Sequence, residues 1–180
     1  MQWSQLKKRF EDTFAESVQG RVRIWATRYR DSHDQAGECW VTFDKEQIIN
    51  MADLTYDKAY YGEAQRIREQ GDCLDYKNPE QQEGYYHACV QAEDRATQNS
   101  IFHSGDVMLA MEEYLNASID EALASPSPLL RAFALLDRRF GKRRLLAFEP
   151  LTKHPLEQKF YELRCLLDGV PSRSNNTQQA

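Results

Sequence analysis

The sequence predicts an α+β fold in which an N-terminal helix packs on a three-stranded antiparallel meander and a mainly helical C-terminal two-thirds follows. Two changes of hydrophobic periodicity indicate this fold: helical spacing gives way to alternation near Gly20 and returns near Leu54. A chain of 180 residues with 41% hydrophobic residues is long and apolar enough for one core. We therefore predict a single domain over residues 1–170, with the helix and sheet in 1–55, the helical part in 56–170 and a disordered tail over 171–180.

The first helix is predicted from apolar side chains at helical spacing, and Gly20 is a natural end for it. These side chains are Trp3, Leu6, Phe10, Phe14 and Val18. Three strands then follow, over residues 21–30, 38–44 and 47–52, because each run alternates and is rich in β-forming residues. The alternation predicts one apolar face, with Val22, Ile24, Ala26, Val41, Phe43, Ile49 and Met51, that packs against the first helix.

The remaining helices are predicted from capping residues and apolar stripes. Pro79 and Pro155 mark two helix starts, and Ser127 precedes proline at a first helical position. Ser118 and Glu121 have the spacing of a capping box. The predicted helices cover residues 56–70, 79–99, 106–116, a short segment from 118, 128–140, 142–148 and 155–167.

The formal net charge of −5 is unevenly distributed along the chain. Residues 128–170 carry nine Lys and Arg against five Asp and Glu, whereas residues 1–127 carry thirteen against twenty-three. Attraction between the two halves explains this distribution, and it competes with the idea that the basic end binds an acidic partner.

The sequence predicts a cytoplasmic protein that does not associate with membranes. No apolar stretch follows the basic N-terminal residues, and no run approaches the ~18 apolar residues that span a bilayer. The four cysteines, Cys39, Cys73, Cys89 and Cys165, are widely spaced, which favours reduced thiols over disulfides.

Common catalytic and ligand motifs are absent from the sequence, which has no Cys-x-x-Cys, no His-Glu-x-x-His, no glycine-rich phosphate loop, no Gly-x-Ser-x-Gly and no EF-hand loop. We therefore expect no metal and no cofactor, and we expect His87, His103 and His154 to be structural or solvated. Whether the chain is an enzyme stays open, because catalytic groups can assemble from distant positions.

The best local group of reactive side chains runs from the end of the first strand into a loop. Arg28 and Arg30 could hold an anion, and His33, oriented by Asp34 or Asp31, could act as a general base. A second acid or base would come from Asp137 or Glu162. Charged residues of this kind are also typical of any exposed hairpin connection, which is the competing interpretation.

Two surfaces are candidates for binding. The face of the sheet with Arg23, Trp25, Tyr29 and Trp40 is too apolar to face solvent alone, so either the later helices cover it or a partner does, a protein or a single-stranded nucleic acid. The second candidate is the basic segment with Arg138, Arg139, Lys142, Arg143 and Arg144, which could contact phosphates.

Several stretches resemble a known family: Trp3 to Lys7, Thr27 to Arg30 with Ser32 to Asp34, Ser118 to Leu123, Leu136 to Arg139 with Gly141 to Leu145, and Phe160 to Cys165. The chain resembles a family of uncharacterised bacterial cytosolic proteins named after an enterobacterial locus. The resemblance runs from the first helix to the last, which implies a single domain, but it implies no activity, cofactor or catalytic residue. The chain departs from the family at Asp44-Lys45-Glu46, where relatives tend to have Asp-Gly.

We conclude from the sequence that the preferred function is a non-enzymatic protein-interaction or regulatory module whose partner is another protein. The first alternative is an enzyme on a phosphate- or carboxylate-bearing substrate that uses Arg28, Arg30, His33 and Asp34. The second alternative is nucleic-acid binding through the basic 138–144 segment. The sequence does not determine the oligomeric state.

Overall fold

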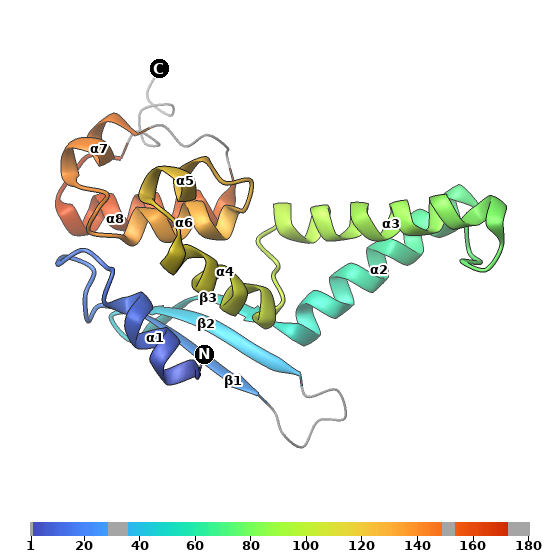
Figure 1. The fold of residues 1–180 in the computed structure, drawn as a ribbon, viewed down its shortest axis with the longest axis horizontal. Coiled ribbons are helices and arrows are strands. Elements are labelled where there is room, and N and C mark those ends of the chain that lie inside the picture. The colour runs from blue at the N-terminus through green and yellow to red at the C-terminus, as the bar shows by residue number, and fades with distance from the viewer. Residues whose placement is uncertain (1, 29–35, 149–153, 173–180) are drawn as a thin grey trace. The chain divides into compact units, whose positions relative to one another are not determined.

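An N-terminal helix, a three-stranded antiparallel meander and a series of helices follow one another along the chain, so the predicted α+β fold is confirmed (Figure 1). The computed structural model describes residues 2–28, 36–148 and 154–172. Its elements are α1 (Trp3–Glu11), β1 (Val22–Arg28), β2 (Gly37–Phe43), β3 (Glu46–Ala52), α2 (Asp53–Gly71), α3 (Pro79–Gln98), α4 (Ser104–Asn116), α5 (Ile119–Ala124), α6 (Pro128–Leu136), α7 (Lys142–Ala147) and α8 (Pro155–Asp168).

The chain forms two compact units. The first unit contains Met1–Trp25, Trp40–Asn50 and Gly105–Ala180, and the second contains Ala26–Cys39 and Met51–Ser104. Each strand of the meander therefore contributes residues to both units. The predicted single domain over residues 1–170 stays a prediction, and the predicted tail lies outside the described residues from position 173 onward.

The core of the first unit is built around α6, whose nine residues are all buried. Helix α8 packs against α6, and Phe160, Tyr161 and Cys165 of α8 are buried. Phe10 of α1 packs edge-on against Tyr114 and Phe133. Burial of several aromatic side chains of this size supplies the main stabilisation of the unit.

Helix α1 ends at Glu11, earlier than the apolar spacing predicts. Phe14 and Val18 are buried as predicted, but from a turn segment in which Phe14 forms an isolated antiparallel bridge with Asp137. The amide of Ala15 also donates to the carbonyl of Leu136. Pairing with the chain after α6 therefore replaces the hydrogen bonds that a longer helix would have made.

The meander has the strand order β1-β2-β3 and buries most of its predicted apolar face. Val22, Ile24, Val41 and Met51 are buried, whereas Ala26, Phe43 and Ile49 are half-buried. Strands β2 and β3 are joined by Asp44 and Lys45, which both have positive φ, at 48° and 75°. This is the pattern of a two-residue type I′ turn, which favours Asn or Asp followed by Gly.

Replacing Lys45 with glycine is expected to raise the free energy of unfolding by about 0.5–1 kcal/mol. A residue with a Cβ is destabilised by roughly 1–2 kcal/mol in the left-handed region, and glycine removes this strain. The greater freedom of glycine in the unfolded chain offsets part of that stabilisation. Urea unfolding of Lys45→Gly against the parent protein measures the difference. Glu46→Gly, in the adjoining strand position, should destabilise instead, and a Lys45→Gly protein no more stable than the parent would contradict the turn assignment.

The second unit is dominated by an antiparallel hairpin of α2 and α3, which lie side by side (Figure 1). The buried residues along its interface are mostly alanines: Ala64 on α2, and Ala88, Ala92 and Ala96 on α3. At the tip, Gly84 leaves room for Cys73, whose Cβ would lie 3.0 Å from a Cβ at position 84. The buried core of the hairpin is thus small, and the tyrosine side chains of the hairpin lie outside it.

Helix starts follow the predicted capping signals in part. The capping box of Ser118 and Glu121 is present at α5, and Asn78 caps α3 through a hydrogen bond from the amide of Glu80. Ser127 makes no such side-chain bond at α6. The four cysteines are free thiols. Among the helices of the described residues, none combines the length and the apolar character that a bilayer crossing requires.

Candidate protein-binding surface

Trp25 on β1 is a large aromatic side chain that stays 41% exposed. Its indole Nε1 donates a hydrogen bond to Oγ1 of Thr42 on β2, at 3.0 Å. Its ring stacks on that of Trp40, with 6.4 Å between the centroids and 18° between the planes. The exposed ring is therefore held in one orientation by two neighbours on the adjacent strand.

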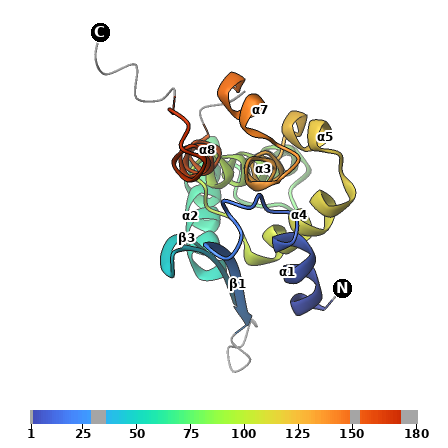
Figure 2. The ribbon, with the colours of Figure 1, turned by 90° about the vertical axis from the view of Figure 1, so that its left-hand side faces the viewer.

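Helix α1 lies beside β1 (Figure 2), and side chains of α1 contact the residues around Trp25. The ammonium of Lys7 lies 3.5 Å from the centroid of the Trp25 ring, a cation–π contact. Glu11 accepts a hydrogen bond from the amide of Ile24, at 3.0 Å, and pairs with Arg23 at 3.3 Å. Because β1 is an edge strand, the carboxylate of Glu11 satisfies a backbone donor that the sheet leaves unpaired.

We name this group the tryptophan face: Lys7, Arg23, Trp25, Trp40 and Thr42. Trp25 and Arg23 lie two residues apart on one strand and share a side, opposite the buried Val22 and Ile24. The prediction that these rings face away from the apolar face is consistent with this burial. Tyr29, the fourth predicted member of the surface, lies outside the described residues.

Two features of the tryptophan face are typical of side chains that anchor interfaces. Immobilising a flexible side chain on binding costs about 0.5–1.5 kcal/mol, and the hydrogen bond and stacking of Trp25 remove much of that cost in the free protein. Tryptophan and arginine are the residues most enriched among those that dominate interface energies. The predicted alternative in which later helices cover the rings leaves the 41% exposure of Trp25 unexplained.

The basic segment is exposed, but three of its five cations have partners. Arg139 binds the buried carboxylate of Asp137 at 2.9 Å, Arg144 pairs with Asp120 at 3.0 Å, and Lys142 donates to the carbonyl of Asp168.

Arg138 and Arg143 remain, and within the described residues neither side chain has a hydrogen-bond or ion-pair partner. The five charges thus do not form one uniform surface for phosphates.

The candidate catalytic group is described only at its first residue. Arg28 is exposed at the end of β1, whereas Arg30, His33 and Asp34 lie outside the described residues. Of the two further candidates, Glu162 is exposed and accepts a hydrogen bond from Gln158.

The other further candidate, Asp137, is fully buried and bound to Tyr114 and Arg139, at 2.6 and 2.9 Å. Burial and then this carboxylate raise the pKa of the Tyr114 hydroxyl well above its usual range. Asp137 is therefore a structural carboxylate rather than an accessible acid or base.

A carboxylate and imidazole pair in the second unit was not predicted from the sequence. Asp53, at the start of α2, is 5% exposed and accepts hydrogen bonds from the amides of Gly37 and Ser104, each at 2.6 Å. Nε2 of His103 lies 3.4 Å from the same carboxylate, and its side chain is 42% exposed. The three segments that meet here are far apart in the chain, so no local motif could have revealed the pair.

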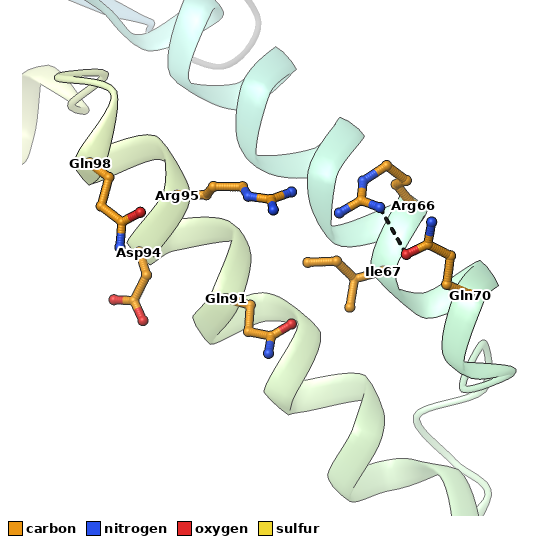
Figure 3. Close-up of a pocket in the computed structure, with 7 residues that line it drawn as sticks. All are labelled: Arg66, Ile67, Gln70, Gln91, Asp94, Arg95 and Gln98. Atoms are coloured by element: carbon orange, nitrogen blue, oxygen red, sulfur yellow. Dashed lines mark hydrogen bonds between the residues drawn. The ribbon is translucent and has the colours of Figure 1, made fainter.

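Helices α2 and α3 also border a shallow groove of about 340 Å³. The side chains that line it are mainly amides and charged groups: Arg66, Ile67, Gln70, Gln91, Asp94, Arg95 and Gln98 (Figure 3). Arg66 and Arg95 are both engaged with Glu63 of α2, and Arg66 also donates to Gln70. The groove is thus bordered by an ion-pair cluster that joins the two helices.

Acidification is expected to weaken the hairpin through Glu63. Hydrogen bonds from Arg66, against the opposing effect of burial, lower the pKa of Glu63 to about 2 from 4.5. Because the folded pKa is depressed, the stabilisation is complete above about pH 4.5 and is lost as the pH falls toward 2. Circular dichroism during acid titration should show a smaller loss over this range in Glu63→Gln than in the parent protein; superimposable curves would contradict the expectation.

The model described as the SF0329 protein family matches residues 2–165. No curated protein and no solved structure matches the chain. Within the described residues, no three His, Cys, Asp or Glu side chains are grouped so that they could hold a metal ion.

Proposed function

The chain belongs to the SF0329 protein family, and we propose that it works as a non-enzymatic protein-interaction or regulatory module that binds a protein partner through the tryptophan face. One observation carries the proposal: Trp25 is 41% exposed although its indole nitrogen is hydrogen-bonded and its ring is stacked. The exposed part of this rigid ring contributes little to the stability of the fold. Burying it against a partner would remove its remaining apolar surface from water, which favours binding.

Photo-cross-linking in cells tests this proposal. We expect p-benzoylphenylalanine at position 23, next to Trp25 on the same side of β1, to give a discrete protein adduct. The same group at position 166 should not, although Leu166 on α8 is 70% exposed. The adduct at position 23 should disappear when Trp25→Ala is added. An adduct that survives this substitution, or one found only at position 166, would refute the proposal.

The Asp53 and His103 pair favours one alternative, an enzyme on a phosphate- or carboxylate-bearing substrate. A buried carboxylate beside a half-exposed imidazole can orient it for proton transfer. Of the residues predicted for such an enzyme, Arg28 lies at the end of β1, and Arg30, His33 and Asp34 lie outside the described residues. NMR titration with inorganic phosphate should then shift the His103 ring signals, and unchanged signals at millimolar phosphate would exclude this alternative.

Nucleic-acid binding through residues 138–144 is the weaker alternative. Of the five cations of this segment, only Arg138 and Arg143 have side chains without a partner within the described residues, so few are available for phosphates.

A further inference from the structure

Helix α3 carries a stripe of acidic and apolar side chains on its outer side. We name Glu83, Tyr86, Val90 and Asp94 the acidic stripe; their spacing of three, four and four residues places them on one side of the helix. The buried alanines of α3 lie on the opposite side. Tyr86 and Val90 are 53% and 56% exposed.

The carboxylates of the acidic stripe are available for a partner. Within the described residues, neither the carboxylate of Glu83 nor that of Asp94 has a hydrogen-bond or ion-pair partner. Figure 3 shows Arg95 reaching toward α2, whereas Asp94 points away from that helix. The hairpin residues 53–98 carry ten Asp and Glu against five Lys and Arg, so the surroundings of the stripe are also negative.

The first unit carries exposed cations that are close together in the sequence, near an exposed leucine. We name Arg138, Lys142, Arg143 and Leu146 the basic patch. Leu146 is 48% exposed and lies one helical turn from Lys142 and Arg143 on α7. The guanidinium groups of Arg138 and Arg143 have no partner within the part of the chain that the structure describes.

We propose that the acidic stripe of one copy of the protein binds the basic patch of a second copy. The two surfaces complement each other twice: Glu83 and Asp94 meet free guanidinium groups, and Tyr86 and Val90 meet Leu146. Because every molecule carries both surfaces, the contact is heterologous and can repeat from copy to copy. Its charges are exposed, so the association is weak and strongly dependent on salt. This inference goes beyond the proposed function, because no residue of the tryptophan face takes part in it.

Sedimentation velocity with charge-reversed variants tests the inference. In 50 mM salt the sedimentation coefficient of the parent protein should rise with concentration, and in 500 mM salt it should not. The stripe variant, Glu83→Lys with Asp94→Lys, and the patch variant, Arg138→Glu with Arg143→Glu, should each stay monomeric. An equimolar mixture of the two variants should associate again, because each reversed surface then meets its complement.

A matched control separates the site from the overall charge. Asp106→Lys with Glu113→Lys, two exposed positions on α4, changes the net charge by the same amount as the stripe variant and should keep the parent behaviour. A parent protein that is monomeric at every concentration overturns the inference. So does a stripe variant that associates like the parent, or a variant mixture that remains monomeric.

Discussion

Replacing Arg164 with methionine is expected to lower the free energy of unfolding by about 3–5 kcal/mol, because removing one partner of a buried ion pair leaves the other charge uncompensated. Arg164 on α8 is 3% exposed and binds Asp168 at 2.9 Å. Its guanidinium also donates to the carbonyls of Leu135, Asp137 and Phe140, each at 3.2 Å. Methionine fills similar space but leaves these acceptors and a buried carboxylate without their donor.

The pH dependence of this loss gives an independent check. Burial opposes ionisation of Asp168, but hydrogen bonds from Ser17 and Arg164 hold its pKa below the usual value. Without Arg164 burial prevails, so the pKa rises and the carboxylate can be protonated in mild acid. The difference between Arg164→Met and the parent protein should therefore be largest at neutral pH and should shrink toward pH 4.

Urea unfolding measures both effects, with Arg144→Met as the control. Arg144 forms an ion pair with Asp120 in which both side chains are exposed, so its loss should leave stability almost unchanged. A loss below about 1 kcal/mol for Arg164→Met would contradict the stabilising role assigned to the buried ion pair and the three carbonyl hydrogen bonds of Arg164.

The order and type of the elements could be predicted from the sequence because local periodicity determines them. The alternation in β1 and β2 and the apolar stripes of α6 and α8 are local properties. The ends of α1 and α6 could not be predicted, because long-range contacts determine them. Helix α6 stops at Leu136, four residues before the predicted end, where Asp137 bridges to Phe14 and is bound by Tyr114.

For the candidate surface, too, the local pattern could be predicted from the sequence and the contacts between elements could not. Strand alternation indicates that Arg23 and Trp25 lie opposite Val22 and Ile24. It does not indicate that Thr42 would accept the indole hydrogen bond or that Lys7 would lie over the ring, because these contacts join different elements. For the same reason the pairing of Arg144 with Asp120 could not be predicted from the basic segment.

Replacing Trp25 with alanine is expected to weaken binding of the cross-linked partner by about 30-fold or more. Central tryptophans at interfaces commonly contribute 2 kcal/mol or more, and 1.4 kcal/mol corresponds to a tenfold change in Kd. The fold should persist, because Trp25 is 41% exposed and contributes little to the buried core. Leu166→Ala, which removes another exposed apolar side chain from the first unit, is the matched control.

The dissociation constant of the purified partner for Trp25→Ala, measured by isothermal titration calorimetry beside the parent protein and Leu166→Ala, is the most direct test of the proposed function. We predict a loss of about 30-fold or more for Trp25→Ala and an unchanged constant for Leu166→Ala. Equal affinities for Trp25→Ala and the parent protein, with circular dichroism spectra that match, would contradict the assignment of the tryptophan face as the binding surface.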